Sequence, residues 1–148
     1  TPTAYQHTSK SRSTAAREGY FLDYAEAMKS ALTMPLMVTG GFRSADVMNA
    51  AIAANKTDLV GVGRPFIIDP EFPLKLLSGS ITAAPAIERD FPPADELPRG
   101  AVLNWFCAQL AHQAANGQPD LDLSVEEGHQ QYLEMIVKAT RRLQTARR

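Results

Sequence analysis

The sequence lacks several features that would assign it to a functional class. It has a single cysteine, Cys107, so an intrachain disulfide is excluded, and no Cys/His group has the spacing of a zinc site. No apolar run approaches the roughly 20 residues that span a bilayer. The net charge of −1 creates no field that would attract nucleic acid or anionic lipid. We therefore expect a cytoplasmic protein without a nucleic-acid or membrane partner.

The composition is that of an ordinary globular protein. Hydrophobic residues make up 45% of the 148 residues and charged residues 21%, which is typical of a chain that buries a core and is not disordered. The first residue is Thr1 and not methionine. We therefore expect that the chain is processed or cropped, or that its true beginning is missing.

Two short apolar runs alternate with segments of helical periodicity. Residues 36–39 and 58–63 have almost no polar face, which is typical of strands buried on both sides in a parallel sheet. Helices are predicted before, between and after them, so the alternation indicates parallel βαβ units and an α/β fold. The first helix starts near Ser13, the second is capped by Ser44 and closed by Asn55, and the third runs from Asp69-Pro70 to about Leu77. The predicted buried stripes of the first two helices are Phe21, Ala25, Met28 and Leu32, and Val47, Met48, Ala51 and Ile52.

The rest of the chain departs from this alternation. Prolines at 85, 92, 93 and 98 predict a loop over residues 80–100. A helix is then expected from about Ala101 to Gly117, and another from the capping box Ser124–Glu127. This gives three parts: βα units over 1–79, a connecting loop over 80–100 and a helical extension over 101–148. The predicted buried faces of the last two helices are Leu103, Phe106, Cys107, Leu110 and Ala114, and Tyr132, Ile136, Ala139 and Leu143.

Glycines follow both predicted strands. Gly40 and Gly41 come directly after the first, and Gly63 and Arg64 come after the second. Glycine lets backbone N–H groups approach an anion without an intervening Cβ, and ligands bind at the carboxyl ends of parallel strands. A guanidinium can also bind two phosphate oxygens at once. The pattern predicts a phosphate site built from these four residues, although they could also be ordinary loop residues.

Two longer motifs carry a family resemblance. PLMVTGGFR (35–43) and DLVGVGRPFIIDP (58–70) together resemble the C-terminal barrel segment of Old Yellow Enzyme-like NADH:flavin oxidoreductases. The segment 17–21 is similar to the helix before the seventh strand in that family. The resemblance covers residues 13–79 well and is looser beyond residue 100. It implies that this chain is the C-terminal portion of a (β/α)8 TIM barrel, with about strands 7 and 8 and a helical extension.

The resemblance also implies cofactors and a reaction. Gly40, Gly41, Gly63 and Arg64 would hold the phosphate of FMN, and NAD(P)H would reduce the flavin. Family members pass the hydride on to an activated alkene such as an enone. The substrate-binding His/His or His/Asn pair comes from earlier strands, and His7, His112 and His129 do not match its context. No catalytic residue is therefore carried over to this chain, and a homo-oligomer is left open.

The chain is too short to form a complete (β/α)8 barrel. A (β/α)8 barrel needs about 250 residues, so we expect this chain to be a fragment of an NAD(P)H:flavin oxidoreductase. Two alternatives remain: a truncated product without catalysis, or a different phosphate-binding TIM-barrel enzyme. A Rossmann site is rejected, because the third glycine of its motif is missing. We expect structural roles for His112, His129 and Cys107 and an N-cap role for Asp69, whereas Tyr5 could have a substrate-side role.

Overall fold

The computed structural model describes residues 21–146 and divides the chain into two compact units, residues 1–62 and 63–148. Each unit is described by itself below. The predictions made for Tyr5, His7 and the helix start at Ser13 lie outside the described residues.

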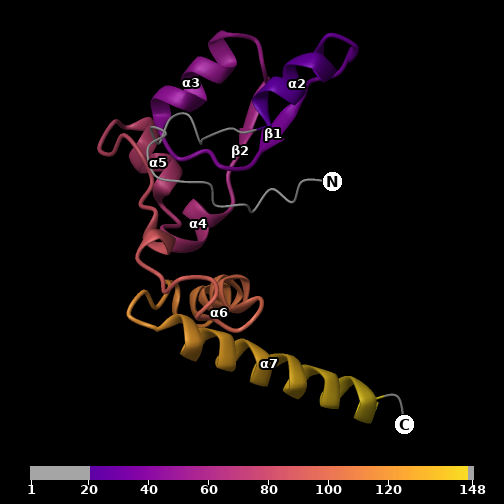
Figure 1. The fold of residues 1–148 in the computed structure, drawn as a ribbon, viewed down its shortest axis with the longest axis vertical. Helices are drawn as coiled ribbons and strands as arrows, with labels where there is room; N and C mark the ends of the chain where they lie inside the picture. Colours follow the sequence, from indigo (N-terminus) through magenta and orange to yellow (C-terminus); the bar gives the residue numbers. More distant parts are fainter. Residues whose placement is uncertain (1–20, 147–148) are drawn as a thin grey trace. The chain divides into compact units, whose positions relative to one another are not determined.

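The first unit contains a parallel βαβ arrangement (Figure 1). Helix α2 (Leu22–Lys29) precedes strand β1 (Met37–Thr39), and helix α3 (Ala45–Ala53) connects β1 to strand β2 (Leu59–Gly61). The strands pair in parallel, with Met37 beside Leu59, Val38 beside Val60 and Thr39 beside Gly61. The predicted α/β class and the predicted order of these elements are confirmed.

The core of the first unit lies on one face of the strand pair. Four buried residues pack together there: Ala25 of α2, Val38 of β1, Ala51 of α3, and Phe42 from the turn between β1 and α3. The prediction that both faces of the strands are buried is wrong. On the face away from this core, Met37 is 59% exposed and its partner Leu59 is 56% exposed. The two helices supply apolar side chains to the Val38 side alone. The predicted helix stripes hold only in part, since Phe21, Met28 and Ile52 are exposed.

Local signals place the turns of the first unit. Ser44 is extended and is the N-cap residue of α3, as predicted. Asn55 follows α3 with a φ of 57°, the left-handed conformation expected of it. Gly61 is required by the partner strand, because a Cβ built on it would collide with the Thr39 side chain.

The second unit is helical. It contains α4 (Arg64–Ile68), α5 (Phe72–Leu77), a 3-10 turn η1 (Ile87–Arg89), α6 (Ala101–Asn116) and α7 (Val125–Ala146). Its buried core joins Ile68, Ala101, Trp105, Phe106 and Val125. Helix α7 crosses α6 and packs against it (Figure 1). The Trp105 indole donates a hydrogen bond to the Leu123 carbonyl oxygen at 2.8 Å, which fixes the ring between the two helices.

Two predictions in the second unit are corrected at the start of α5. Helix α4 was not predicted, and Asp69 is the residue that ends it. The N-cap position of α5 is Glu71, two residues beyond the predicted start. Asp69 is nevertheless extended, and its carboxylate accepts the Glu71 N–H at 3.0 Å, which is the contact that an N-cap side chain makes. The carboxylate also pairs with Lys75 at 2.8 Å, so Asp69 ends α4 and caps the turn that leads into α5.

The predicted buried faces of α6 and α7 are also largely wrong. Leu103 and Leu110 are 67% and 48% exposed, and Ile136 and Leu143 of α7 are exposed as well. The buried side of α6 contains Phe106, as predicted, and also Trp105, Ala108 and Gln109. Gln109 is buried because its side chain exchanges two hydrogen bonds with the backbone of Asp120, both at 2.7 Å. Hydrophobic periodicity cannot find a face that includes a satisfied glutamine.

Candidate functional site

The two strands of the first unit end side by side, and a glycine turn follows β1. Thr39 and Gly61 are register partners and are the last residues of their strands. Gly40 and Gly41 have φ values of 134° and 75°. A residue with a Cβ is strained in this region, so the turn itself requires glycine at both positions. It leads through Phe42, which is buried, into α3.

Gly63 differs from these two glycines. It is exposed, it is the N-cap residue of α4, and its φ of −114° is one that any residue adopts. A Cβ built on Gly63 meets no atom within 4 Å. The fold of the chain alone therefore gives no reason for glycine here, and the space beside the backbone is open.

Arg64 is the first residue of α4, and its contacts include Glu88 and Phe106. Its Nη1 lies 3.4 Å from Oε1 of Glu88 in η1. Its Cζ lies 5.2 Å from the centre of the Phe106 ring in α6. Neither neighbour was predicted, because Glu88 is 24 residues away along the chain and no local pattern signals a contact over that separation.

The four predicted site residues are divided between the units. Gly40 and Gly41 belong to the first unit, whereas Gly63 and Arg64 begin the second. The chain runs from β2 through Val62 directly into Gly63.

Asp58 anchors the start of β2. Its carboxylate accepts the Leu36 N–H at 2.8 Å and pairs with the Lys29 ammonium at 2.8 Å. The hydrogen bond from Leu36, followed by that from Lys29, holds the pKa of Asp58 below its ordinary value. Asp58 directly precedes β2 and Leu36 directly precedes β1. The carboxylate therefore connects the starts of the two strands.

This arrangement predicts an acid-sensitive strand pair. Because the folded-state pKa of Asp58 is lowered, its carboxylate stabilises the fold above the unfolded pKa of about 4, and this contribution is lost as the pH falls further. We expect Asp58→Asn to reduce the dependence of stability on pH below about 4. Urea midpoints followed by circular dichroism across this range measure the effect, with Asp46→Asn at an exposed position of α3 as control. Equal pH dependence in the wild type and Asp58→Asn would contradict this role.

The other candidate residues of the second unit have structural partners. His112 lies 3.0 Å from the Gln131 side chain, and His129 lies 2.9 Å from that of Asn104, so both imidazoles connect α6 to α7. Cys107 is partly buried on α6. Within residues 21–146, no group of three His, Cys, Asp or Glu side chains could hold a metal ion. Over the same residues, no helix is both long and apolar enough to cross a membrane.

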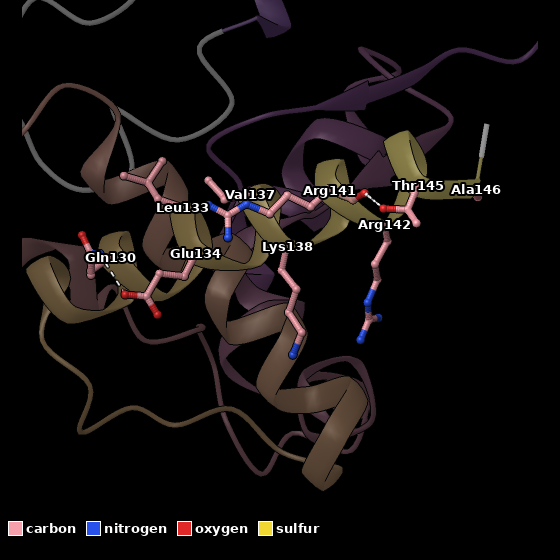
Figure 2. Close-up of a pocket in the computed structure, with 9 residues that line it drawn as sticks. All are labelled: Gln130, Leu133, Glu134, Val137, Lys138, Arg141, Arg142, Thr145 and Ala146. Atoms are coloured by element: carbon pink, nitrogen blue, oxygen red, sulfur yellow. Dashed lines mark hydrogen bonds between the residues drawn. The ribbon is translucent and has the colours of Figure 1, made fainter. Parts of the chain in front are cut away.

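A hollow of about 850 Å³ lies along α7 (Figure 2). Its lining combines apolar side chains such as Leu133 and Val137 with the basic residues Lys138, Arg141 and Arg142. One acidic side chain, Glu134, lies among them and accepts a hydrogen bond from Gln130 at 2.9 Å. The lining includes no histidine, no cysteine and a single carboxylate, that of Glu134.

Curated relatives match part of the chain. It is 43% identical over 58 residues to the NADH-dependent flavin oxidoreductase iccE of Talaromyces variabilis, covering 38% of this chain and 14% of the relative. It is 40% identical over 79 residues to iliE of Neonectria sp. (strain DH2), covering 49% and 10%. It is 32% identical over 60 residues to a cinnamate reductase of Clostridium sporogenes, covering 40% and 9%. The matched segment thus spans no more than 14% of the length of these three relatives.

A family comparison covers more of the chain. The model of the NADH:flavin oxidoreductase / NADH oxidase family matches residues 2–82, which is more than half of the 148 residues and includes both glycine loops. The family is one of flavoprotein oxidoreductases that use FMN with NADH as reductant, which confirms the cofactors expected for it. This chain belongs to the NADH:flavin oxidoreductase / NADH oxidase family.

Proposed function

We propose that this chain is the C-terminal portion of an FMN-dependent (β/α)8-barrel oxidoreductase and supplies the loops that bind the FMN phosphate. The observation that carries the proposal is the parallel pairing of β1 and β2, which end together at Thr39 and Gly61. In (β/α)8 barrels a phosphate site is frequently built by the loops after strands 7 and 8. The strands β1 and β2 would be these two.

Each loop offers a different kind of contact to a phosphate. The left-handed backbone at Gly40 and Gly41 presents peptide groups that no Cβ shields. Gly63 leaves open space beside its backbone. Arg64 adds a permanent positive charge whose N–H groups donate strong hydrogen bonds to phosphate oxygens. Backbone donors together with one guanidinium fit a phosphate monoester such as that of FMN.

The reaction proposed for the whole enzyme follows from the family. When bound, FMN would supply the hydride-transfer chemistry between NADH and an activated alkene of the enone type. The similarity to a protein named cinnamate reductase supports an unsaturated substrate. This segment would contribute by fixing the phosphate end of the cofactor, because an anchored phosphate lowers the entropy cost of orienting the flavin ring. The residues that hold and protonate the substrate would come from other strands.

A substitution at Gly63 tests the proposal. The full-length protein should be purified with a yellow cofactor that is released as FMN and bleached by NADH. Gly63→Leu should be purified without flavin, because the leucine side chain fills the space assigned to the phosphate. Its melting temperature in the FMN-free form should equal that of the wild type, since a Cβ at Gly63 meets nothing within 4 Å. Ala83→Leu is the control, since Ala83 is also exposed but lies outside the proposed site.

The alternatives predict other results. A colourless full-length protein that ignores added FMN would favour a barrel that binds another phosphorylated compound. A truncated product without catalysis is indicated if the coding sequence upstream of Thr1 does not contain the remaining βα units. Full retention of flavin by Gly63→Leu would show that the phosphate is not bound at this loop.

A further inference from the structure

We propose that Glu88 is a positioning residue for Arg64, and that it orders the guanidinium against the Phe106 ring before the FMN phosphate binds. The inference rests on the proposed function, because it takes the phosphate as the ligand of Arg64. It concerns three parts of the second unit that are far apart in sequence: α4, η1 and α6.

The ion pair limits the guanidinium from one side. Nη1 of Arg64 lies 3.4 Å from Oε1 of Glu88. The Glu88 side chain is only 19% exposed, whereas that of Arg64 is 41% exposed. The carboxylate is therefore the more enclosed partner, and the arginine side chain is the more exposed one. A largely enclosed carboxylate has little freedom to follow the arginine, so it acts as a fixed point.

The Phe106 ring limits the guanidinium from a second side. Phe106 is 3% exposed and belongs to the core of the second unit. Its ring packs edge-on against Trp105, with the centroids 5.1 Å apart. The Arg64 Cζ lies 5.2 Å from the Phe106 ring centre, within the range of a cation–π contact. The ring is immobilised by the core, and the guanidinium lies on its face.

Together these contacts have a consequence for binding. A free arginine side chain has many rotamers, and their loss on binding opposes association. A guanidinium already held by a carboxylate and an aromatic ring has lost much of that freedom, so less affinity is given up when it meets a phosphate. The Glu88 charge also reduces the positive potential at the site. The proposal requires the ordering effect to exceed this electrostatic effect.

A double-mutant cycle in the full-length protein tests the proposal. The dissociation constant of FMN is measured by flavin fluorescence for the apoproteins of wild type, Glu88→Ala, Arg64→Ala and the double variant. We expect Glu88→Ala to weaken FMN binding roughly tenfold, within the coupling range of contacting residues. In the Arg64→Ala background the same change should have an effect below about twofold. Glu88→Gln, which keeps an acceptor oxygen, should recover most of the affinity.

Controls separate this role from a structural one. Glu96→Ala removes an exposed carboxylate from the same loop and should leave the affinity unchanged. Riboflavin, which lacks the phosphate, should bind wild type and Glu88→Ala equally. Circular dichroism identifies a variant that fails to fold, and Glu88→Gln then takes its place in the cycle, where a smaller loss that requires Arg64 is expected.

Two results would overturn the inference. Tighter FMN binding by Glu88→Ala would show that the carboxylate only competes with the phosphate. An equal loss with Arg64 present and in the Arg64→Ala background would show that Glu88 acts on the fold and not through the guanidinium. Failure of the proposed function is distinguishable, because Arg64→Ala would then leave FMN affinity unchanged.

Discussion

Gly128→Val is expected to destabilise the second unit by roughly 3 kcal/mol, at the upper end of the range for overpacked cores. Gly128 is buried where α7 crosses α6. A Cβ built on it lies 2.6 Å from Cδ1 of Trp105 and 3.2 Å from the Trp105 Cα. The indole cannot move aside easily, because it is fully buried and donates a hydrogen bond to Leu123. Glycine in a helix costs up to about 1 kcal/mol relative to alanine, so its presence here reflects close packing of the helices.

The single tryptophan makes this prediction directly measurable. Trp105 is the only tryptophan of the 148 residues, so in these residues its fluorescence reports on the α6–α7 contact. Urea titrations followed by Trp105 emission should give a lower midpoint for Gly128→Val. Gln144→Val places the same side chain on an exposed position of α7 and should change the midpoint little. If the two variants unfold at the same urea concentration, the helices are not in close contact at Gly128.

The local features of the fold could be predicted from the sequence because short-range chemistry determines them. The capping box forms as expected, with the Ser124 hydroxyl donating to Glu127 at 2.7 Å and the Glu127 N–H returning a bond at 3.2 Å. Asn55, Gly79 and Gly117 follow their helices with positive φ. Each of these signals involves residues within a few positions of one another, so no knowledge of the tertiary structure is needed.

The predictions that failed depend on contacts between distant segments. The exposed side of β1, where Met37 is 59% exposed, follows from the side on which α2 and α3 pack. Gln109 is completely buried, although glutamine is read as a surface residue. Helix α4 was missed because its five residues are too few to show helical periodicity, and its last residue, Ile68, is buried in a core with Trp105. In each case the partner is separated from the residue by many positions, and hydrophobic periodicity contains no information about it.

The four residues of the candidate site could be predicted from the sequence, but the contacts that hold Arg64 could not. Gly40, Gly41, Gly63 and Arg64 were selected because they follow strands, and the strand pairing that places β1 beside β2 is confirmed. Their binding of a phosphate stays a prediction. The contacts of Arg64 with Glu88 and Phe106 carried no signal in the sequence, although Phe106 was predicted to be buried.

Arg64→Ala is the second substitution with a large expected effect. A hydrogen bond to a charged group contributes about 1.5–3 kcal/mol, so loss of the guanidinium should weaken FMN binding roughly 10- to 150-fold. Arg64→Lys should fall between the wild type and Arg64→Ala, because lysine keeps the charge without the planar fork of donors. Affinities of the full-length apoproteins for FMN measure this order, and equal affinities of all three proteins would exclude Arg64 from the site.

The most direct test of the phosphate site compares FMN with riboflavin, which has the same ring system without the phosphate. Dissociation constants of both flavins are measured for the full-length wild type and for Arg64→Ala. The wild type should strongly prefer FMN, and Arg64→Ala should lose most of that preference while its affinity for riboflavin stays unchanged. Equal weakening of both flavins, or an FMN preference that survives the substitution, would contradict the assignment of Arg64 to the phosphate.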